Sequence, residues 1–278
     1  MEINNTAQTK VNNHYNNTDL DILIAKLKLF GFNWKSKNGI DVLESSDRLH
    51  KYIIIRPEVK STDGLTWIKE GPAKHYYFIG GSGLESISSL FSMNVDTVDI
   101  SMLDTSKVTR MNYLFNTCSY DIIGLDKLNT SNVKFMNGMF FNYKKDKLDL
   151  SNFDTHNVIE MEEMFYGCEI GELNISKFDT SNVRDMVKMF AFCEINSLDL
   201  SNFSTSRVTA MYQMFRSSKI KNLNISSFDT SNVEDARQMF MHSEIPFIDV
   251  RHFKNIQKSD DMFFNCTGTV FKRVNWDI

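Results

Sequence analysis

Two copies of one motif decide the fold: LDLSNFDTHNVIEMEEMFYGC at residues 148–168 and LDLSNFSTSRVTAMYQMFRSS at residues 198–218. Around them, three ladders of apolar residues repeat with a period of 25 residues. The first ladder consists of Phe115, Phe140, Phe165, Phe190, Phe215 and Phe240. The second consists of Leu103, Leu128, Phe153, Phe178, Phe203, Phe228 and Phe253, and the third of Val108, Val133, Val158, Val183, Val208 and Val233. Self-similarity at a fixed period indicates a protein built from stacked repeats.

Each unit is expected to contain one short strand and one short helix. Residues 148–150 alternate apolar, polar, apolar, as in a strand with one buried face. The apolar residues further along have the spacing of one helix face: Val158, Met161, Met164 and Phe165. In the polar turn between them, such as DTSN, we expect an asparagine to cap the helix and the acid three residues later to reach back. These pairs are Asn157 with Glu160, Asn182 with Asp185 and Asn232 with Asp235.

A single unit of this size cannot bury its apolar face, but stacked units can. The repeat therefore predicts an α/β solenoid of about eight turns over residues 84–269, with a parallel sheet on one face and short helices on the other. Before it, residues 1–18 are predicted to be a disordered tail and residues 19–83 a small α+β cap or separate module. Within that segment we expect a helix at 20–30 and strands at 52–59 and 76–79. Residues 270–278 are predicted to cap the other end.

The composition is that of a folded, mildly acidic protein. The 278 residues are 42% hydrophobic and carry 31 Lys and Arg against 35 Asp and Glu, a net charge of −4. This charge disfavours direct nucleic-acid binding, and no apolar run approaches the roughly 18 residues of a membrane span. Because the N-terminus lacks the basic and apolar regions of a signal peptide, we expect a cytoplasmic protein. The alternative is a secreted or cell-surface protein whose signal has been removed.

No motif for catalysis or metal binding stands out. The six histidines show no zinc-binding spacing, and no Walker, dinucleotide or nucleophile-elbow motif is present. We therefore expect no enzymatic activity, no cofactor and no metal. All four cysteines occupy one repeat position: Cys118, Cys168, Cys193 and Cys266. Cys168 and Cys193 would lie about 5 Å apart, within disulfide reach, but buried free thiols are favoured because a small apolar residue fits this position.

A polar column is expected on the exposed face of the sheet, one residue per turn: Asp99, Gly124, Asp149, Asn174, Asp199, Asn224 and Asp249. Alternate-turn carboxylates would lie about 10 Å apart, too far to share one calcium ion. The column is then either a solvated face or a partner-binding surface. In the second case the binding residues are its Asp and Asn members together with Phe247 at the flank. Because acidic side chains favour a basic partner, a protein that handles nucleic acids is one candidate.

A second candidate surface is the aromatic segment WIKEGPAKHYYF at residues 67–78. Its rings either stack on a sugar or peptide ligand or cover the first turn of the solenoid.

The unit LDLSNFDTxNVxxMxxMFxxC resembles the 25-residue bacterial leucine-rich repeat of BspA-like surface proteins, over roughly residues 84–266. The resemblance implies a leucine-rich-repeat solenoid that binds a macromolecular partner and does not catalyse. Two functions follow as expectations. One is an intracellular protein-binding module, such as an inhibitor from a phage or mobile element, and the alternative is a bacterial surface adhesin or glycan-binding protein. The open ends of a parallel solenoid also allow end-to-end homodimers where a cap is poor.

Overall fold

The computed structural model describes residues 15–254 and 256–273. Over this part the chain forms a β-solenoid, in which parallel strands from successive turns pair side by side. Its contacts divide it into two compact units. The first unit comprises Met1–Ile87, Met93–Val108 and Tyr120–Thr130, and the second comprises Ser88–Ser92, Thr109–Ser119 and Ser131–Ile278.

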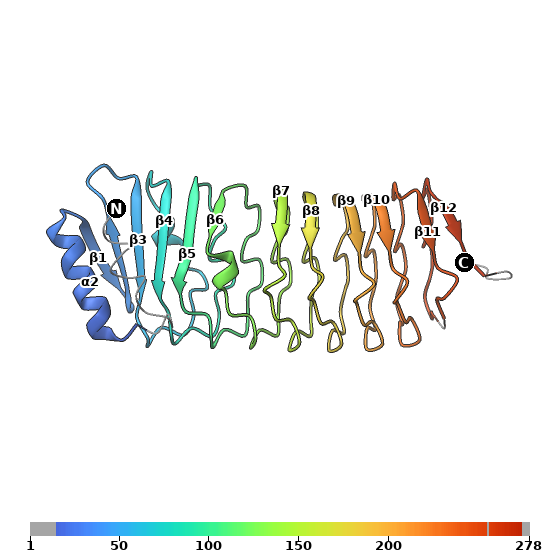
Figure 1. Cartoon of the computed structure of the whole chain (residues 1–278), viewed down its shortest axis with the longest axis horizontal. Helices are drawn as coiled ribbons and strands as arrows, with labels where there is room; N and C mark the ends of the chain where they lie inside the picture. The colour runs from blue at the N-terminus through green and yellow to red at the C-terminus, as the bar shows by residue number, and fades with distance from the viewer. Residues whose placement is uncertain (1–14, 255, 274–278) are drawn as a thin grey trace. The chain divides into compact units, whose positions relative to one another are not determined.

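The first unit is built on a six-stranded sheet with the order β1-β2-β3-β4-β5-β6. The strands are β1 Asn33–Lys37, β2 Ile40–Glu44, β3 His50–Ile55, β4 His75–Gly80, β5 Thr97–Leu103 and β6 Asp121–Ile123. Strands β1 to β3 pair antiparallel, whereas β3 to β6 pair parallel (Figure 1). Two 3-10 helices, η1 Thr66–Lys69 and η2 Leu125–Lys127, lie in the connections. Since His50 pairs with His75, the 25-residue offset starts before residue 84, where the repeat becomes visible in the sequence.

Helix α2, Asn17–Leu29, packs on this sheet and is the one α-helix among the described residues. Asn16 caps it, because the Asn16 side chain accepts the N–H of Asp19 and the Asp19 side chain accepts the N–H of Asn16. Its apolar face joins sheet residues in one buried cluster: Leu20, Ile24, Leu27, Leu43, Ile54 and Ile79. The helix predicted at 20–30 is thus confirmed. It begins inside the predicted tail 1–18, of which residues 1–14 lie outside the described residues.

The second unit carries two parallel sheets, one with the order β10-β9-β8-β7 and one formed by β11 and β12 (Figure 1). The strands are β7 Lys144–Asp149, β8 Glu169–Asn174, β9 Glu194–Asp199, β10 Lys219–Asn224, β11 Phe247–Asp249 and β12 Thr269–Phe271. Register partners are 25 residues apart in the sheet of β7 to β10, as with Lys144 and Glu169, and 22 residues apart between β11 and β12. The predicted parallel sheet is therefore confirmed. Of the predicted cap 270–278, residues 270 and 271 belong to β12 and residues 274–278 lie outside the described residues.

The short helices predicted on the other face are wrong, because this part of each unit consists of turns. Glu163 has a positive φ of 55°, which interrupts a right-handed helix. The Glu163 N–H donates to the Val187 carbonyl on the next turn, and the Phe165 N–H donates to Met189, both at 2.9 Å. The alternate residues, such as Met164 and Tyr166, instead donate their N–H groups to the carbonyls of Met161 and Glu163, three residues earlier in the same turn. The apolar spacing imitates a helix, but every second N–H has its partner in the next turn.

The asparagines expected to cap those helices link adjacent turns instead. Asn157 Nδ2 donates to the Ser131 carbonyl at 2.7 Å, and Asn182 and Asn232 bond the preceding turn in the same way. Thr180 reaches the following turn, since its Oγ1 donates to the Ser204 carbonyl (2.9 Å) and accepts the Ser204 N–H (2.8 Å). The same pair of bonds is made by Thr105, Thr155, Thr205 and Thr230. The DTSN segment therefore joins turns to one another.

The core of the second unit contains a continuous stack of phenylalanine rings, as the first apolar ladder predicts. It consists of Phe91, Phe115, Phe140, Phe165, Phe190, Phe215, Phe240 and Phe263. Adjacent ring centroids are 5.2 to 5.7 Å apart, and the rings are within 20° of parallel. This spacing is typical of favourable offset stacking.

Phe165→Ala is expected to lower the free energy of unfolding by about 3–5 kcal/mol, because it removes a fully buried ring from the middle of the stack. Phe192→Ala, which truncates a ring that is 45% exposed, is the matched control, with an expected loss below about 1 kcal/mol. Urea unfolding followed by circular dichroism measures both. Equal losses in the two variants would contradict a core role for the stack.

Thr180→Val is expected to cost about 1–3 kcal/mol, because it leaves the Ser204 carbonyl and N–H without their partner hydroxyl. Thr180→Ser keeps the hydroxyl and serves as the control. The same unfolding measurement separates the variants: if the valine variant is as stable as the serine variant, the inter-turn bond does not stabilise the solenoid.

Candidate binding surface

The predicted polar column lies where the strands of the second unit end. Its members there are the last residues of β7 to β10, namely Asp149, Asn174, Asp199 and Asn224, all exposed or half-buried. The Asp149 carboxylate accepts the N–H of Ser151 at 3.0 Å. Equivalent bonds run to the other three from Ser176, Ser201 and Ser226. Each column residue therefore closes the turn that follows its strand, as Asp and Asn do in Asx turns.

Adjacent members of the column are also bonded in pairs. Asn174 Nδ2 donates to Asp149 Oδ1, and Asn224 Nδ2 donates to Asp199 Oδ1, each at 2.9 Å. An amide can donate to a carboxylate, whereas two carboxylates on adjacent turns would repel one another. Hydrogen bonds from the backbone N–H groups of Ser151 and Ser201 hold the pKa values of Asp149 and Asp199 below their usual range. The alternation of Asp and Asn thus has a structural reason.

Of the other predicted binding residues, Asp249 closes a turn in the same way, since its carboxylate accepts the N–H of Arg251 at 3.1 Å. Asp99 lies in β5 of the first unit, where it accepts the N–H of Ser101 at 2.9 Å. Asp249 ends β11 and accepts a 2.6 Å bond from the Arg251 guanidinium, which lowers the pKa of Asp249 to about 2. Phe247, on the same strand, is 66% exposed. Its ring is the largest apolar group offered to a partner on β11.

Charged side chains form further cross-turn pairs on the second unit. Lys144 of β7 pairs with Glu169 of β8, and Lys147 Nζ lies 3.6 Å from a Glu172 carboxylate oxygen. All four side chains are more than half exposed. Exposed ion pairs contribute little stability, so these groups can exchange their contacts for those of a partner.

This sheet face is hollowed at Gly171, a feature that sequence reasoning missed. Glycine stands there in β8 where the neighbouring strands carry Asp146 and Asn196. Two depressions of about 430 and 450 Å³ adjoin at Gly171. A Cβ at this position would lie 2.7 Å from the Asp146 carbonyl oxygen, so glycine also permits the close approach of β7 and β8. The available signal was one glycine at a repeat position that otherwise holds larger residues.

The aromatic segment 67–78 does not form a single surface. Trp67 lies in η1, away from the strand that carries the other rings. On β4, Tyr76 and Phe78 are buried in the core, whereas Tyr77 faces the other way and stacks on Tyr52 with ring centroids 4.5 Å apart. Alternate residues of a strand point to opposite faces, and this divides the segment.

The cysteine ladder consists of thiols. All four cysteines lie in the described part of the chain, where none forms a disulfide, and Cys118, Cys168 and Cys193 are buried. The Cys168 thiol donates to the Phe140 carbonyl at 2.9 Å. Burial raises the pKa of Cys168 to about 12 and that of Cys193 well above its usual value. Neither thiol is therefore a nucleophile near neutral pH.

Among residues 15–254 and 256–273, no three His, Cys, Asp or Glu side chains are grouped so that they could hold a metal ion. A helix with the length and apolar character needed to cross a bilayer is likewise absent from these residues.

Acid is expected to destabilise the protein partly through the column. Asp149 and Asp199 have lowered pKa values in the folded state, so their stabilisation is complete above the unfolded pKa and is lost as the pH falls through the folded one. Asp149→Asn with Asp199→Asn keeps the hydrogen-bond acceptors but cannot titrate. Urea unfolding between about pH 5 and pH 2 should show a shallower loss of unfolding free energy in the double variant. Parallel curves would contradict this role.

The repeat region matches a known protein family. The family model described as "Mycoplasma protein of unknown function, DUF285" matches residues 85–197 and 169–276. These overlapping ranges include every strand from β5 to β12 and span more than half of the chain. No curated protein and no solved structure matches the chain. The extent of the family match shows that the chain belongs to the DUF285 family.

Proposed function

We propose that this chain is a non-catalytic binding protein that recognises a protein partner through the sheet face of β7 to β10. The observation that carries the proposal is the hollow at Gly171, which lies in the middle of a face with polar and charged walls. A protruding side chain of a partner can enter such a hollow and add contacts to those that the outward side chains of the sheet offer. Exposed sheets are also the surfaces that solenoids use for binding.

The charge of the walls favours a basic partner. Acidic side chains predominate around Gly171, with Glu169, Glu194 and Asp199 lining the two depressions beside Lys144 and Lys145. Complementary charge raises the rate of encounter and selects among partners. A protein with a basic surface, such as one that binds nucleic acid, therefore fits this face.

The face is preorganised for binding. The carboxylates of Asp149 and Asp199 each accept two hydrogen bonds. One comes from the backbone N–H two residues further on, and the other from an asparagine side chain on the next solenoid turn. Side chains that are already ordered lose little conformational entropy on association. The resemblance of the repeat to BspA-like leucine-rich repeats, which are used for binding, supports the same proposal.

Site-specific photo-cross-linking tests it directly. A photoreactive residue is placed at Glu172 or Ser197 on the sheet face, and, as controls, at Arg184 or Glu234, which are exposed but lie outside the strands. The full chain is expressed in its native cells and irradiated. We expect adducts with one basic protein from the sheet positions and not from the controls. Adducts that form equally at both sets of positions, or only at the controls, would reject the sheet face as the binding surface.

A variant that fills the hollow provides the second arm. Asn196→Trp places an indole at the rim of the depression beside Gly171, and Arg184→Trp is the matched control outside the sheet. Adduct formation from Ser197 is expected to fall at least about tenfold in the first variant, the result of losing a central contact. It should stay unchanged in the second, with thermal unfolding used to check that both variants fold.

A further inference from the structure

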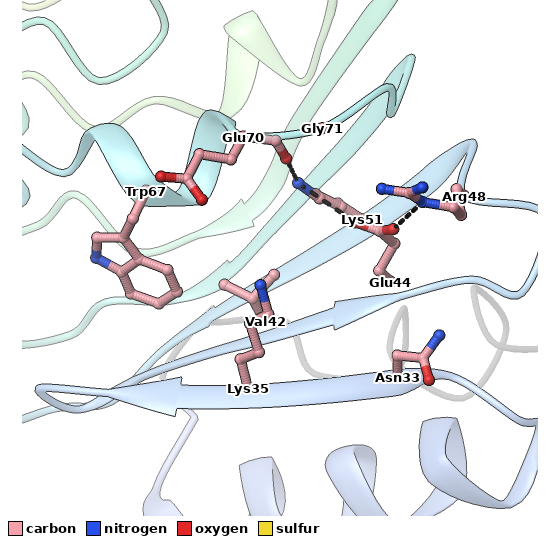
Figure 2. Close-up of a pocket in the computed structure, with 9 residues that line it drawn as sticks. All are labelled: Asn33, Lys35, Val42, Glu44, Arg48, Lys51, Trp67, Glu70 and Gly71. Carbon is pink, nitrogen blue, oxygen red and sulfur yellow. Dashed lines mark hydrogen bonds and ion pairs between the residues drawn. The ribbon is translucent and has the colours of Figure 1, made fainter.

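The first unit contains a cavity that the proposed function does not use. It lies between strands β1 to β3 and the segment around η1, and its volume is about 220 Å³ (Figure 2). Its wall carries three cationic side chains, Lys35, Arg48 and Lys51, against two acidic residues, Glu44 and Glu70. The lining is therefore net positive in a chain that is net negative.

Lys51 is a buried cation at this cavity. Its side chain is only 4% exposed, and its Nζ donates to the Glu70 carbonyl and lies 3.4 Å from Glu44 Oε2. Arg48 shares that carboxylate, because its Nε donates to Glu44 Oε1 at 2.9 Å. One carboxylate thus serves two cations, and burial lowers the pKa of Lys51. A second anion beside Lys51 would offset the cost of burying its charge.

Gly71 lines the cavity next to Lys51 and Arg48. Its φ is +98°, a conformation that other residues rarely adopt. A Cβ built on Gly71 would lie 3.6 Å from Lys51 Nζ, 3.7 Å from Arg48 Nη2 and 3.8 Å from Glu44 Oε2, so two cations and one carboxylate surround this position. Because Gly71 has no side chain, the space in front of these two cationic groups and the Glu44 carboxylate is left open. Ammonium and guanidinium groups both bind carboxylate oxygens through charge-assisted hydrogen bonds.

The other part of the cavity combines an indole and an apolar side chain with charged groups. Figure 2 shows the Trp67 indole apart from the contact of Glu44, Arg48 and Lys51, with the Glu70 carboxylate extending toward it. Val42 is buried and contributes an apolar surface. A flat indole beside an apolar side chain accommodates the face of a six-membered ring.

We propose that this cavity binds a small ring-bearing carboxylate, with its carboxylate between Lys51 and Arg48 and its ring against Trp67. The ring can come from an aromatic acid or from a uronic acid, since both combine a six-membered ring with a carboxylate. This site lies wholly within the first unit, so it stands independently of the sheet face of β7 to β10.

Binding to the full chain is measured with two carboxylates and their neutral counterparts. Benzoate is compared with benzamide, and glucuronate with glucose, by saturation-transfer NMR and by tryptophan fluorescence. We expect saturable binding of at least one carboxylate, at least about tenfold tighter than its neutral counterpart, as for a hydrogen bond to a charged group. Binding of benzoate alone identifies the aromatic source and binding of glucuronate alone the sugar source. If neither carboxylate binds at millimolar concentration, or if the neutral compounds bind equally well, the proposal is wrong.

Three variants locate the binding. Lys51→Met is expected to weaken carboxylate binding at least about tenfold. Arg48→Gln changes a side chain that is 61% exposed, so it tests the site even if the buried substitution prevents folding, and we expect a loss of about threefold or more. Lys60→Gln, which removes an exposed lysine paired with Glu85 outside the cavity, is the control and should bind like the wild type. Unchanged affinity in Arg48→Gln and Lys51→Met would place the ligand elsewhere and overturn the assignment.

Discussion

The stacking of one phenylalanine ring on the next is the contact on which the other regularities of the second unit depend. Centroid distances of 5.2 to 5.7 Å bring successive turns close to the spacing of paired strands, about 4.8 Å. At that spacing the Glu163 N–H reaches Val187, Thr180 reaches Ser204, and the amide of Asn174 reaches Asp149. Each bond joins a residue to one 24 or 25 positions away. The parallel sheet, the threonine bonds between turns and the polar column therefore all depend on the same spacing between successive turns.

The ladders were sufficient to predict a solenoid and its parallel sheet, because a 25-residue period leaves few other ways to bury the same phenylalanine in every unit. They were not sufficient for the segment between Val158 and Cys168. Helical spacing was read within one unit, whereas the hydrogen bonds that decide the backbone run to the next. Gly167 in this segment, and Gly138 at the repeat position of Glu163 one unit earlier, both have positive φ and are the local sequence signs of an interrupted helix.

The sequence also predicts the candidate surfaces only in part. Sequence reasoning located Asp149 and Asn174 on the sheet but not their bonds to each other, since these depend on register. The hollow at Gly171 lies at a position where the neighbouring strands carry larger side chains. The cavity beside Lys51 is formed by residues between 33 and 71, a segment in which the sequence shows no repeat. Such features follow from how backbones approach one another, which periodicity alone does not report.

The pairing of Asn174 with Asp149, and of Asn224 with Asp199, makes two turns the true unit of this surface. The sequence carries the same doubling: LNISKFDTSNV at 173–183 returns 50 residues later as LNISSFDTSNV at 223–233, with one substitution. Loss or duplication of a single turn within this stretch would set aspartate beside aspartate or asparagine beside asparagine. Loss or gain of two turns preserves every partner. Two turns are therefore the smallest insertion or deletion that leaves every pair of the column unchanged, whereas a single turn can place two carboxylates side by side.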